Sequence, residues 1–360
     1  MTSIPIPRSF LLVILFLTGL VPSLLAQATS PQATPPAPAS PVVPVALQTN
    51  PPGVQATWKN YTNTYVLPTN VEVFTIPTTS PENLEVPFYV RPPKGYDPAV
   101  PIPGKIYRTL LIIPFLNADA RGTVIGGSLL SLADEKGWFV VAPTLHLLGD
   151  PKDPKISYYY PEQFSGKAIL TALDQIAKKY PIDVNHLLLK GLSGGAQFVH
   201  RFALWAPERV TAVVVNSSSW FDDPNPKASK VAWLVTVGES DPASSNSGDF
   251  ISKLQACGAD PIFRAYFGQS HGGDGKSGGL TDSFLSFYDQ RTAGDLGKPI
   301  DTNNASVVPP ENQMPFVGDS QNWRMVTNTP ENLENIDKEN RIFLPSPEIA
   351  KAWGKGENNP

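Results

Sequence analysis

The fold of this chain is decided by the stretch HLLLKGLSGGAQFVHRFAL, His186 to Leu204. Its first half is an apolar run typical of a short buried strand. After Gly195, apolar residues recur at helical spacing until Pro207 ends the pattern. Ser193 lies between the two halves, with glycines around it. The stretch therefore predicts a strand, a tight turn and a helix in immediate succession.

The tight turn has the spacing GxSxG, with Gly191 and Gly195 two positions before and after Ser193. A serine on a cramped strand-to-helix turn requires small residues at these positions, and the arrangement is known as a nucleophile elbow. The following helix points its free NH groups and the positive end of its dipole at the serine oxygen, which stabilises negative charge. The spacing predicts that Ser193 is a nucleophile in acyl transfer.

The chain around this turn alternates between apolar strands and amphipathic helices. Such alternation predicts an α/β fold with a mostly parallel central sheet and helices on both faces. Two earlier segments, 71–76 and 86–92, alternate in the manner of edge or antiparallel strands. The expected core strands are 109–113, 138–142, the elbow strand, 210–215, 231–237 and 261–267, and the clearest helices are 127–135 and 169–177.

A serine hydroxyl needs a base, and the order Ser, acid, His applies to sheets of this kind. The chain has four histidines, His146, His186, His200 and His271. The first two precede Ser193, and His200 lies along the elbow helix, pointing away from the turn. Only His271 follows a late strand, in the glycine-rich loop GQSHGGDG. We therefore predict that His271 is the base.

The acid is expected after the preceding strand, where the chain reads VTVGESDPASS. A carboxylate there accepts the second imidazole NH, which fixes the tautomer and stabilises the imidazolium. We favour Asp241 over Glu239 because a shorter side chain, further into the loop, reaches back over the sheet more easily. Asp249 begins a helical pattern and is interpreted as an N-terminal charge of that helix.

The phrases GLSGG at Gly191, GESD at Gly238 and SHGG at Ser270 make the region 109–291 resemble an α/β-hydrolase. FYVRPPKGYDP at 88–98 and YPIDVNHLLLKGLSGG at 180–195 are similar to secreted esterases grouped with polyhydroxybutyrate depolymerases and feruloyl esterases. The resemblance implies an acyl-enzyme mechanism without a cofactor. Those enzymes usually have alanine after the serine and a His-Gly pair after the first core strand. This chain has Gly194 and the segment 114–117, Pro-Phe-Leu-Asn, instead.

Stabilisation of the oxyanion requires two converging donors. The elbow makes the Gly194 NH one of them, and the second is expected to be the backbone NH of Phe115 or Leu116. Substrate contacts are expected from Trp220 and Phe221, in a loop too short for a large lid, and from Tyr159. These aromatic residues are equally suited to ordinary packing.

The two ends of the chain have a different character from its middle. Residues 1–28 have the pattern of a signal peptide, with Arg8, an apolar core and a small-residue cleavage site, and an uncleaved membrane anchor is the alternative. Residues 29–57 are expected to form a proline-rich linker, and 58–292 to form the hydrolase domain. Residues 293–360 are expected to form an extension packing on that domain, and a separate binding module is the alternative for this last segment. We therefore expect a secreted or periplasmic protein without stable membrane insertion after cleavage.

Composition narrows the possible partners. The formal net charge of −4 becomes −5 once Arg8 is removed, which argues against nucleic acid. No segment has metal-ligand or phosphate-loop spacing, so neither a metal nor a cofactor is expected. Cys257 is the only cysteine, so no disulfide can form within the chain. The predicted function is cleavage of a small-molecule or polymeric carboxylic ester. The alternatives are a serine peptidase of the prolyl-oligopeptidase type and a non-catalytic surface protein.

Overall fold

The computed structural model describes residues 65–78, 84–272, 276–301 and 306–356. The predictions made for residues 1–28 and 29–57 lie outside these ranges. No helix within the described ranges has both the length and the apolar character needed to span a membrane.

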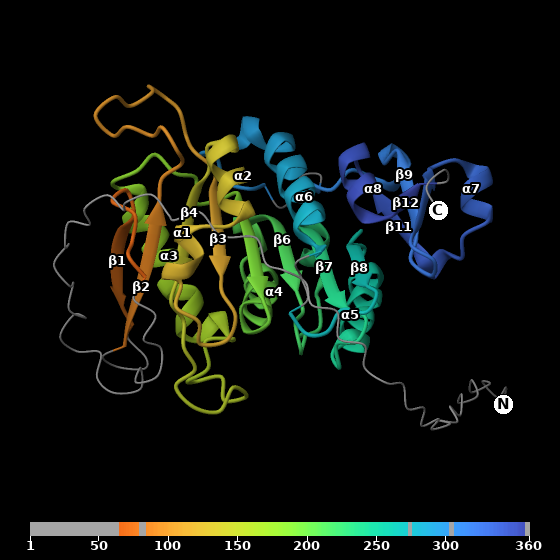
Figure 1. The fold of residues 1–360 in the computed structure, drawn as a ribbon, viewed down its shortest axis with the longest axis horizontal. Helices are drawn as coiled ribbons and strands as arrows, with labels where there is room; N and C mark the ends of the chain where they lie inside the picture. Colours follow the sequence, from red (N-terminus) through yellow and green to blue (C-terminus); the bar gives the residue numbers. More distant parts are fainter. Residues whose placement is uncertain (1–64, 79–83, 273–275, 302–305, 357–360) are drawn as a thin grey trace, which may run out of the picture. The chain divides into compact units, whose positions relative to one another are not determined.

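Eight strands form the central sheet in the order β1-β2-β4-β3-β5-β6-β7-β8 (Figure 1). The first two are antiparallel to their neighbours, and all remaining pairs are parallel. The expected strands differ from the observed ones only at their ends. Their bounds are β1 Glu72–Pro77, β2 Glu85–Arg91, β3 Thr109–Ile113, β4 Phe139–Pro143, β5 Leu187–Leu192, β6 Val210–Asn216, β7 Ala232–Gly238 and β8 Ile262–Tyr266.

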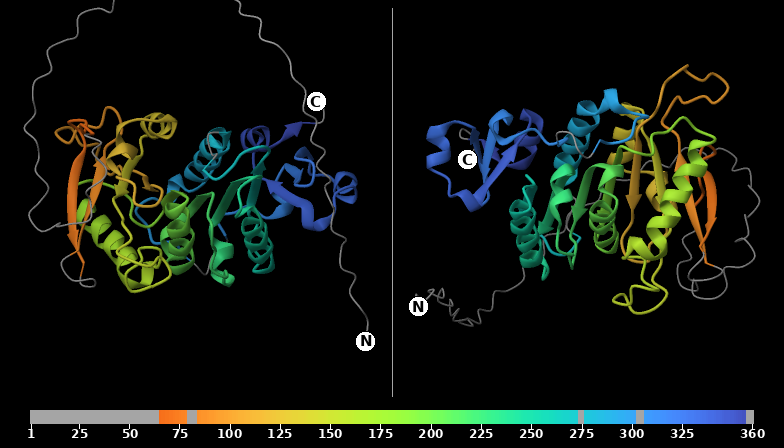
Figure 2. Two further views of the ribbon diagram at one scale, coloured as in Figure 1. Left: turned by 60° about the horizontal axis from the view of Figure 1, so that its bottom comes forward. Right: turned by 180° about the vertical axis from the view of Figure 1, so that it is seen from behind.

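Helices cover both faces of this sheet, as a parallel sheet requires (Figure 2, left). One face is covered by α1 (Arg121–Ile125), α2 (Ser128–Lys136) and α6 (Gly278–Arg291). The other is covered by α3 (Gly166–Ala177), α4 (Gly194–Trp205) and α5 (Ser244–Ala256). The predicted mostly parallel sheet with helices on both faces is confirmed.

The elbow strand β5 supplies apolar residues to both faces in turn. Leu187 and Leu189 join the cluster beneath α3, α4 and α5, and Leu188 joins the cluster on the opposite face. All three are fully buried. Because successive strand residues point to opposite faces, a continuous apolar run is what a strand buried on both sides needs. Local sequence thus places β5 at the centre of the sheet.

The residues after α6 form a second, smaller sheet that the sequence pattern does not predict. Its four strands have the order β11-β9-β10-β12, with bounds β9 Phe316–Asp319, β10 Arg324–Thr327, β11 Arg341–Leu344 and β12 Lys355–Gly356. α7 (Pro330–Glu334) and α8 (Pro347–Trp353) belong to the same part of the chain. The Trp353 indole NH donates to the carbonyl of Phe263 on β8 at 2.6 Å. The Arg264 guanidinium lies 4.3 Å from the centre of the Trp323 ring. These contacts attach the second sheet to β8.

Candidate active site

Ser193 occupies the turn between β5 and α4 with backbone angles of φ 53° and ψ −113°. A non-glycine residue at such angles carries strain of about 1–3 kcal/mol, and strain of this kind clusters at functional sites. The Ser193 NH donates to the carbonyl of Asn216 at the end of β6, at 2.9 Å. The Ser193 carbonyl accepts from the Gln197 NH at 3.0 Å, which begins the helix. The strained serine is therefore fixed from both sides.

Close packing explains the two glycines around Ser193. A Cβ added at Gly191 would overlap the backbone of Gly195 one turn later. A Cβ added at Gly195 would overlap the carbonyl oxygens of Ile113 and Pro114 at the end of β3. Since rigid backbone rather than a movable side chain occupies the space, these positions admit only glycine. The glycines of GxSxG are thus required because α4 packs closely against β3.

The structure brings Ser193 and His271 together, although they come from separate loops at the same edge of the sheet. The Ser193 Oγ lies 2.8 Å from the His271 Nε2. The His271 Nδ1 lies 2.8 Å from the Asp241 Oδ2. With Nδ1–H donating to the carboxylate, Nε2 is the acceptor for the serine hydroxyl. The three side chains form one continuous chain of hydrogen bonds.

Asp241 follows β7 and is almost completely buried, with 3% of its surface exposed. Its second carboxylate oxygen accepts from the Ala243 NH at 2.9 Å, which fixes the orientation of the carboxylate. Glu239, the rival considered from sequence, is exposed, and its closest donor is the Gly268 NH at 3.4 Å. The structure therefore brings Asp241, and not Glu239, to the imidazole.

The loop that carries His271 is held against the sheet at two places. At Gly238 an added Cβ would overlap the carbonyl oxygens of Gln269 and Ser270, so glycine is needed where this loop passes β7. The Gly272 NH donates to the Ser217 Oγ at 3.3 Å. Ser217 is buried at a positive φ of 50°. Sequence reasoning missed Ser217, and the only signal was its position directly after β6 at the edge that carries the site.

The backbone of Leu116 lies beside the first turn of α4. A Cβ added at Gly194 would be 2.9 Å from the Leu116 Cα and 2.7 Å from the Tyr158 hydroxyl. Asn117, at φ 55°, accepts from the Leu147 NH at 2.9 Å through its side chain, which ties down the loop after β3. The side chain of Phe115 is 52% exposed. The predicted oxyanion residues Gly194, Phe115 and Leu116 are thus gathered at one end of the sheet.

The three predicted pocket residues have different surroundings. Trp220 is 49% exposed. Phe221 stacks on Phe250 with ring centres 4.4 Å apart, and both Trp220 and Phe221 border a small cavity of about 170 Å³. Tyr159 is only 4% exposed and packs edge-on against Tyr158 at 4.7 Å. Tyr159 therefore acts in packing rather than as an accessible pocket wall, because neighbouring rings cover it.

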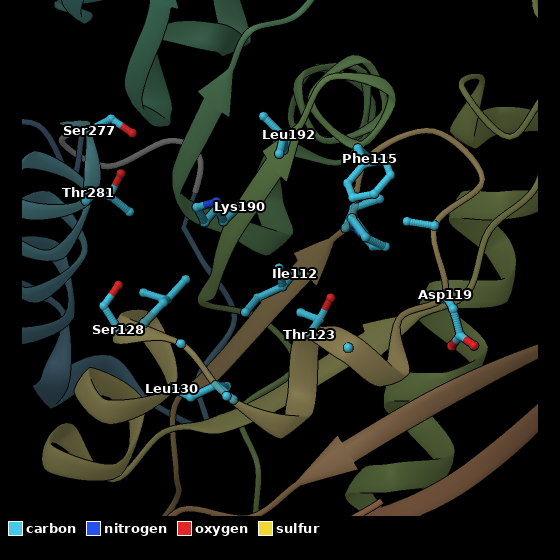
Figure 3. Close-up of a pocket in the computed structure, with 18 of the residues that line it drawn as sticks. Ile112, Phe115, Asp119, Thr123, Ser128, Leu130, Lys190, Leu192, Ser277 and Thr281 are labelled. Atoms are coloured by element: carbon cyan, nitrogen blue, oxygen red, sulfur yellow. The ribbon is translucent and has the colours of Figure 1, made fainter. Parts of the chain in front are cut away.

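A larger cavity of about 530 Å³ lies over the carboxyl ends of β3 and β5, on the face that α1, α2 and α6 cover (Figure 3). It is bordered by Leu192, which directly precedes Ser193, and by Phe115. Ser193 itself is not in the wall. Lys190 of β5 also lines the cavity, between Leu192 and Ile112 in Figure 3. Lys190 is absent from the residues predicted from sequence, although a lysine within an otherwise apolar central strand is a signal that could have identified it.

The buried position of His200 makes this histidine unsuitable as the base. Burial lowers the pKa of His200 to about 3 and keeps the ring neutral. Its Nδ1 lies 3.1 Å from the Ala196 carbonyl, and its Nε2 accepts from the Asp222 NH at 3.1 Å. His200 is therefore a structural residue. Among the described residues, no group of three or more His, Cys, Asp or Glu side chains is arranged to hold a metal ion.

The sequence matches no protein-family model and no curated protein. Among solved structures, the chain is similar to a ferulic acid esterase, with 18% identity, a TM-score of 0.46, and coverage of 61% of this chain and 95% of the other. A thermostable esterase is similar at 19% identity and a TM-score of 0.46, with coverage of 63% and 61%. The fluorophosphonate-binding serine hydrolase F from Staphylococcus aureus is similar at 16% identity and a TM-score of 0.46, with coverage of 61% and 98%.

The fold itself is assigned on the chain's own architecture. A mostly parallel eight-stranded sheet carries helices on both faces. A serine stands on a strained strand-to-helix turn at the carboxyl edge of this sheet. The segment 217–231, between β6 and β7, is short and leaves no room for a large lid. By these features, the chain has an α/β-hydrolase fold.

Proposed function

We propose that this protein is a serine hydrolase that cleaves carboxylic esters through an acyl-enzyme. The single observation that carries the proposal is the hydrogen-bonded series Ser193, His271 and Asp241, with 2.8 Å at both links. A serine hydroxyl in contact with an imidazole, which is in turn oriented by a buried carboxylate, is the arrangement that activates serine for acyl transfer.

In the proposed reaction, the Ser193 Oγ forms a bond to the ester carbonyl carbon while its proton moves to the His271 Nε2. The carbonyl oxygen becomes an oxyanion, held by the NH of Gly194 and an NH of the Phe115–Leu116 segment. When the tetrahedral intermediate collapses, the bond to the alcohol oxygen breaks and that oxygen takes the proton from Nε2. A water molecule then repeats the sequence on the acyl-enzyme, which releases the acid and restores Ser193.

The surroundings of Asp241 and His271 fit the different roles proposed for these two residues. Asp241 is buried and held by the Ala243 NH, so its carboxylate is fixed before the substrate arrives. The His271 side chain is 42% exposed, which leaves Nε2 open to substrate and water. We propose, from residues 1–28, that the enzyme is exported and acts in the periplasm or outside the cell, on small-molecule or polymeric esters.

Labelling with a fluorophosphonate, which reacts only with an activated serine, tests this proposal directly. We expect rapid labelling of the mature protein, complete loss in Ser193→Ala, and labelling slowed by about a thousandfold or more in His271→Ala. Ser252→Ala, on the exposed side of α5, is the matched control and should label like the wild type. Thermal unfolding of each variant establishes that the protein is folded.

Two outcomes separate the proposal from its alternatives. Folded wild-type protein that does not label contradicts it and favours the non-catalytic surface protein. A labelled enzyme that cleaves peptide amides as fast as matched esters favours the serine peptidase. Preference for esters, measured as kcat/KM on ester and amide pairs with the same acyl group, supports the reaction written above.

A further inference from the structure

The carboxyl end of β6 contacts both the nucleophile and the loop that carries its base. β6 ends at Asn216, and Ser217 follows it directly. The Asn216 carbonyl accepts from the Ser193 NH at 2.9 Å. The Ser217 Oγ accepts, at 3.3 Å, from the NH of Gly272, which directly follows His271. One dipeptide therefore contacts the backbone beside each of the two reacting side chains.

The side chain of Asn216 adds a second contact with the region between His271 and α6. This side chain is completely buried. Its Nδ2 donates to the Thr236 Oγ1 of β7 at 2.5 Å and to the Ser277 Oγ at 3.4 Å. Ser277 directly precedes α6. The dipeptide thus contacts the chain both just after His271, at Gly272, and just before α6, at Ser277.

The backbone conformation of Ser217 explains how two consecutive side chains reach the same part of the chain. In a regular strand, the side chains of consecutive residues point to opposite faces of the sheet. At Ser217, φ is 50°, which departs from strand geometry. The Ser217 NH donates to the Thr236 carbonyl at 2.8 Å, which holds this residue on β7. The contacts with Gly272 and Ser277 therefore depend on an unusual conformation.

Local stability does not explain this arrangement. Glycine adopts a positive φ without strain, whereas serine does not. The Asn216 Oδ1 is buried and has no hydrogen-bond partner within the described part of the chain, although buried polar groups are normally satisfied. Unfavourable features of this kind cluster at functional sites. Two of them in consecutive residues beside Ser193 indicate that Asn216 and Ser217 serve the site.

The proposed proton transfer depends on the position of the His271 ring. The His271 side chain is 42% exposed, so packing restricts it only in part. Its Nε2 lies 2.8 Å from the Ser193 Oγ while its Nδ1 lies 2.8 Å from the Asp241 Oδ2. A shift of about 1 Å in a reacting group can slow a reaction about a hundredfold. Small movements of the backbone next to His271 therefore affect the rate.

We propose that Asn216 and Ser217 are positioning residues that fix His271 relative to Ser193. The inference rests on the proposed function and concerns the same site. Both residues act through the backbone, because Asn216 holds the NH of Ser193 and Ser217 holds the NH that follows His271. Their side chains set the rate of the chemical step and leave substrate binding unchanged.

The variant Ser217→Gly separates positioning from stability. Glycine removes the hydroxyl and also relieves the positive φ, so the variant should unfold at about the wild-type temperature. With p-nitrophenyl acetate as substrate, we expect kcat to fall about tenfold and KM to stay nearly unchanged. Fluorophosphonate labelling should slow by a similar factor, because it needs the same proton transfer. Asn216→Ala, which removes the contact with Ser277, should also lower kcat, and Ser217→Gly decides where this second variant does not fold.

Ser346→Ala is the matched control. The Ser346 Oγ is an equivalent acceptor in a buried position, because it receives the Ile349 NH at 3.2 Å at the start of α8. Its loss should lower the unfolding temperature and leave kcat unchanged. Folded Ser217→Gly with the wild-type kcat overturns the inference. An equal loss of kcat in Ser217→Gly and Ser346→Ala overturns it too, since activity would then follow stability alone.

A measurement without substrate distinguishes this inference from the proposed function. In protein with ¹⁵N-labelled histidine, the His271 Nδ1 proton exchanges slowly with water only while it is bonded to Asp241, and His271→Ala identifies its resonance. We expect exchange to be about tenfold faster in Ser217→Gly than in the wild type, and unchanged in Ser346→Ala. Equal exchange in Ser217→Gly and the wild type overturns the inference. A wild type that neither labels nor cleaves the ester contradicts the proposed function, and the exchange rates then still decide whether Ser217 positions His271.

Discussion

The two faces of the central sheet are filled in different ways. Beneath α3, α4 and α5, large side chains such as Phe198, Phe202 and Trp233 pack without exposure. Beneath α1, α2 and α6, the carboxyl ends of β3 and β5 border a cavity of about 530 Å³. β5 takes part in both, because Leu189 is buried in the first face and Lys190 lines the second.

Because of this difference in packing, the two faces contribute differently to the site. The packed face fixes the elbow, since α4 can hold Ser193 in a strained conformation only if the helix is pressed firmly against the sheet. The face with the cavity leaves open space beside Leu192, which directly precedes that serine. The following predictions test this contrast, starting with the largest expected effect.

Gly195→Ala should lower the free energy of unfolding by about 3 kcal/mol, because the added methyl group meets the backbone of Ile113 and Pro114. Urea unfolding measures the change. The control is Gly248→Ala in α5, where an added Cβ has no neighbour within 4 Å. This control should raise stability by about 0.5–1 kcal/mol through helix propensity. Similar losses in the two variants would show that α4 is not tightly packed on β3.

His200 on the packed face should make stability depend on pH. Burial lowers its pKa to about 3, whereas an unfolded histidine titrates near 6.5. Between these values the unfolded chain binds a proton that the folded chain does not. The free energy of unfolding therefore falls with decreasing pH, by about 1.4 kcal/mol per pH unit well below pH 6.5.

The variant His200→Phe isolates this contribution, since phenylalanine can pack between Phe221 and Phe250 without titrating. Urea unfolding from pH 7 down to pH 4.5 should show a slope smaller by about 1.4 kcal/mol per pH unit than in the wild type. Parallel curves for the two proteins would mean that His200 is protonated in the folded state. Burial also lowers the pKa of His146 to about 4, so this histidine adds a similar contribution in both proteins.

Thr281→Val, on the face with the cavity, should have the smallest effect. The Thr281 hydroxyl has no partner among the described residues, so its replacement by a methyl group should leave stability unchanged or raise it by up to about 1 kcal/mol. Thr109→Val is the matched control, because the Thr109 hydroxyl donates to the Asp183 carbonyl at 2.6 Å. The control should lose about 1–2 kcal/mol. A comparable loss in both variants would show that Thr281 is bonded in the free protein.

The second sheet could not be predicted from the pattern of apolar residues in the sequence. Its strands β9, β10 and β11 have four residues each, and β9 pairs with β11 although β10 and α7 lie between them in the chain. Segments so short contain too few positions to reveal a period of two. Their burial also depends on Trp353, which packs with residues of the core rather than with sequence neighbours. The scattered apolar residues of 293–360 therefore predict only an extension packing on the core.

The sequence by itself determined the order of the strands of the central sheet and the position of the elbow, because apolar periodicity and the glycine spacing around Ser193 act over a few neighbouring residues. It also singled out His271, by the order in which residues follow the strands. Only the tertiary structure decided between Asp241 and Glu239, brought in Ser217, and placed Lys190 beside a cavity. These features depend on distances between segments far apart in the chain, such as the 78 residues that separate Ser193 from His271, and local pattern carries no information about such distances.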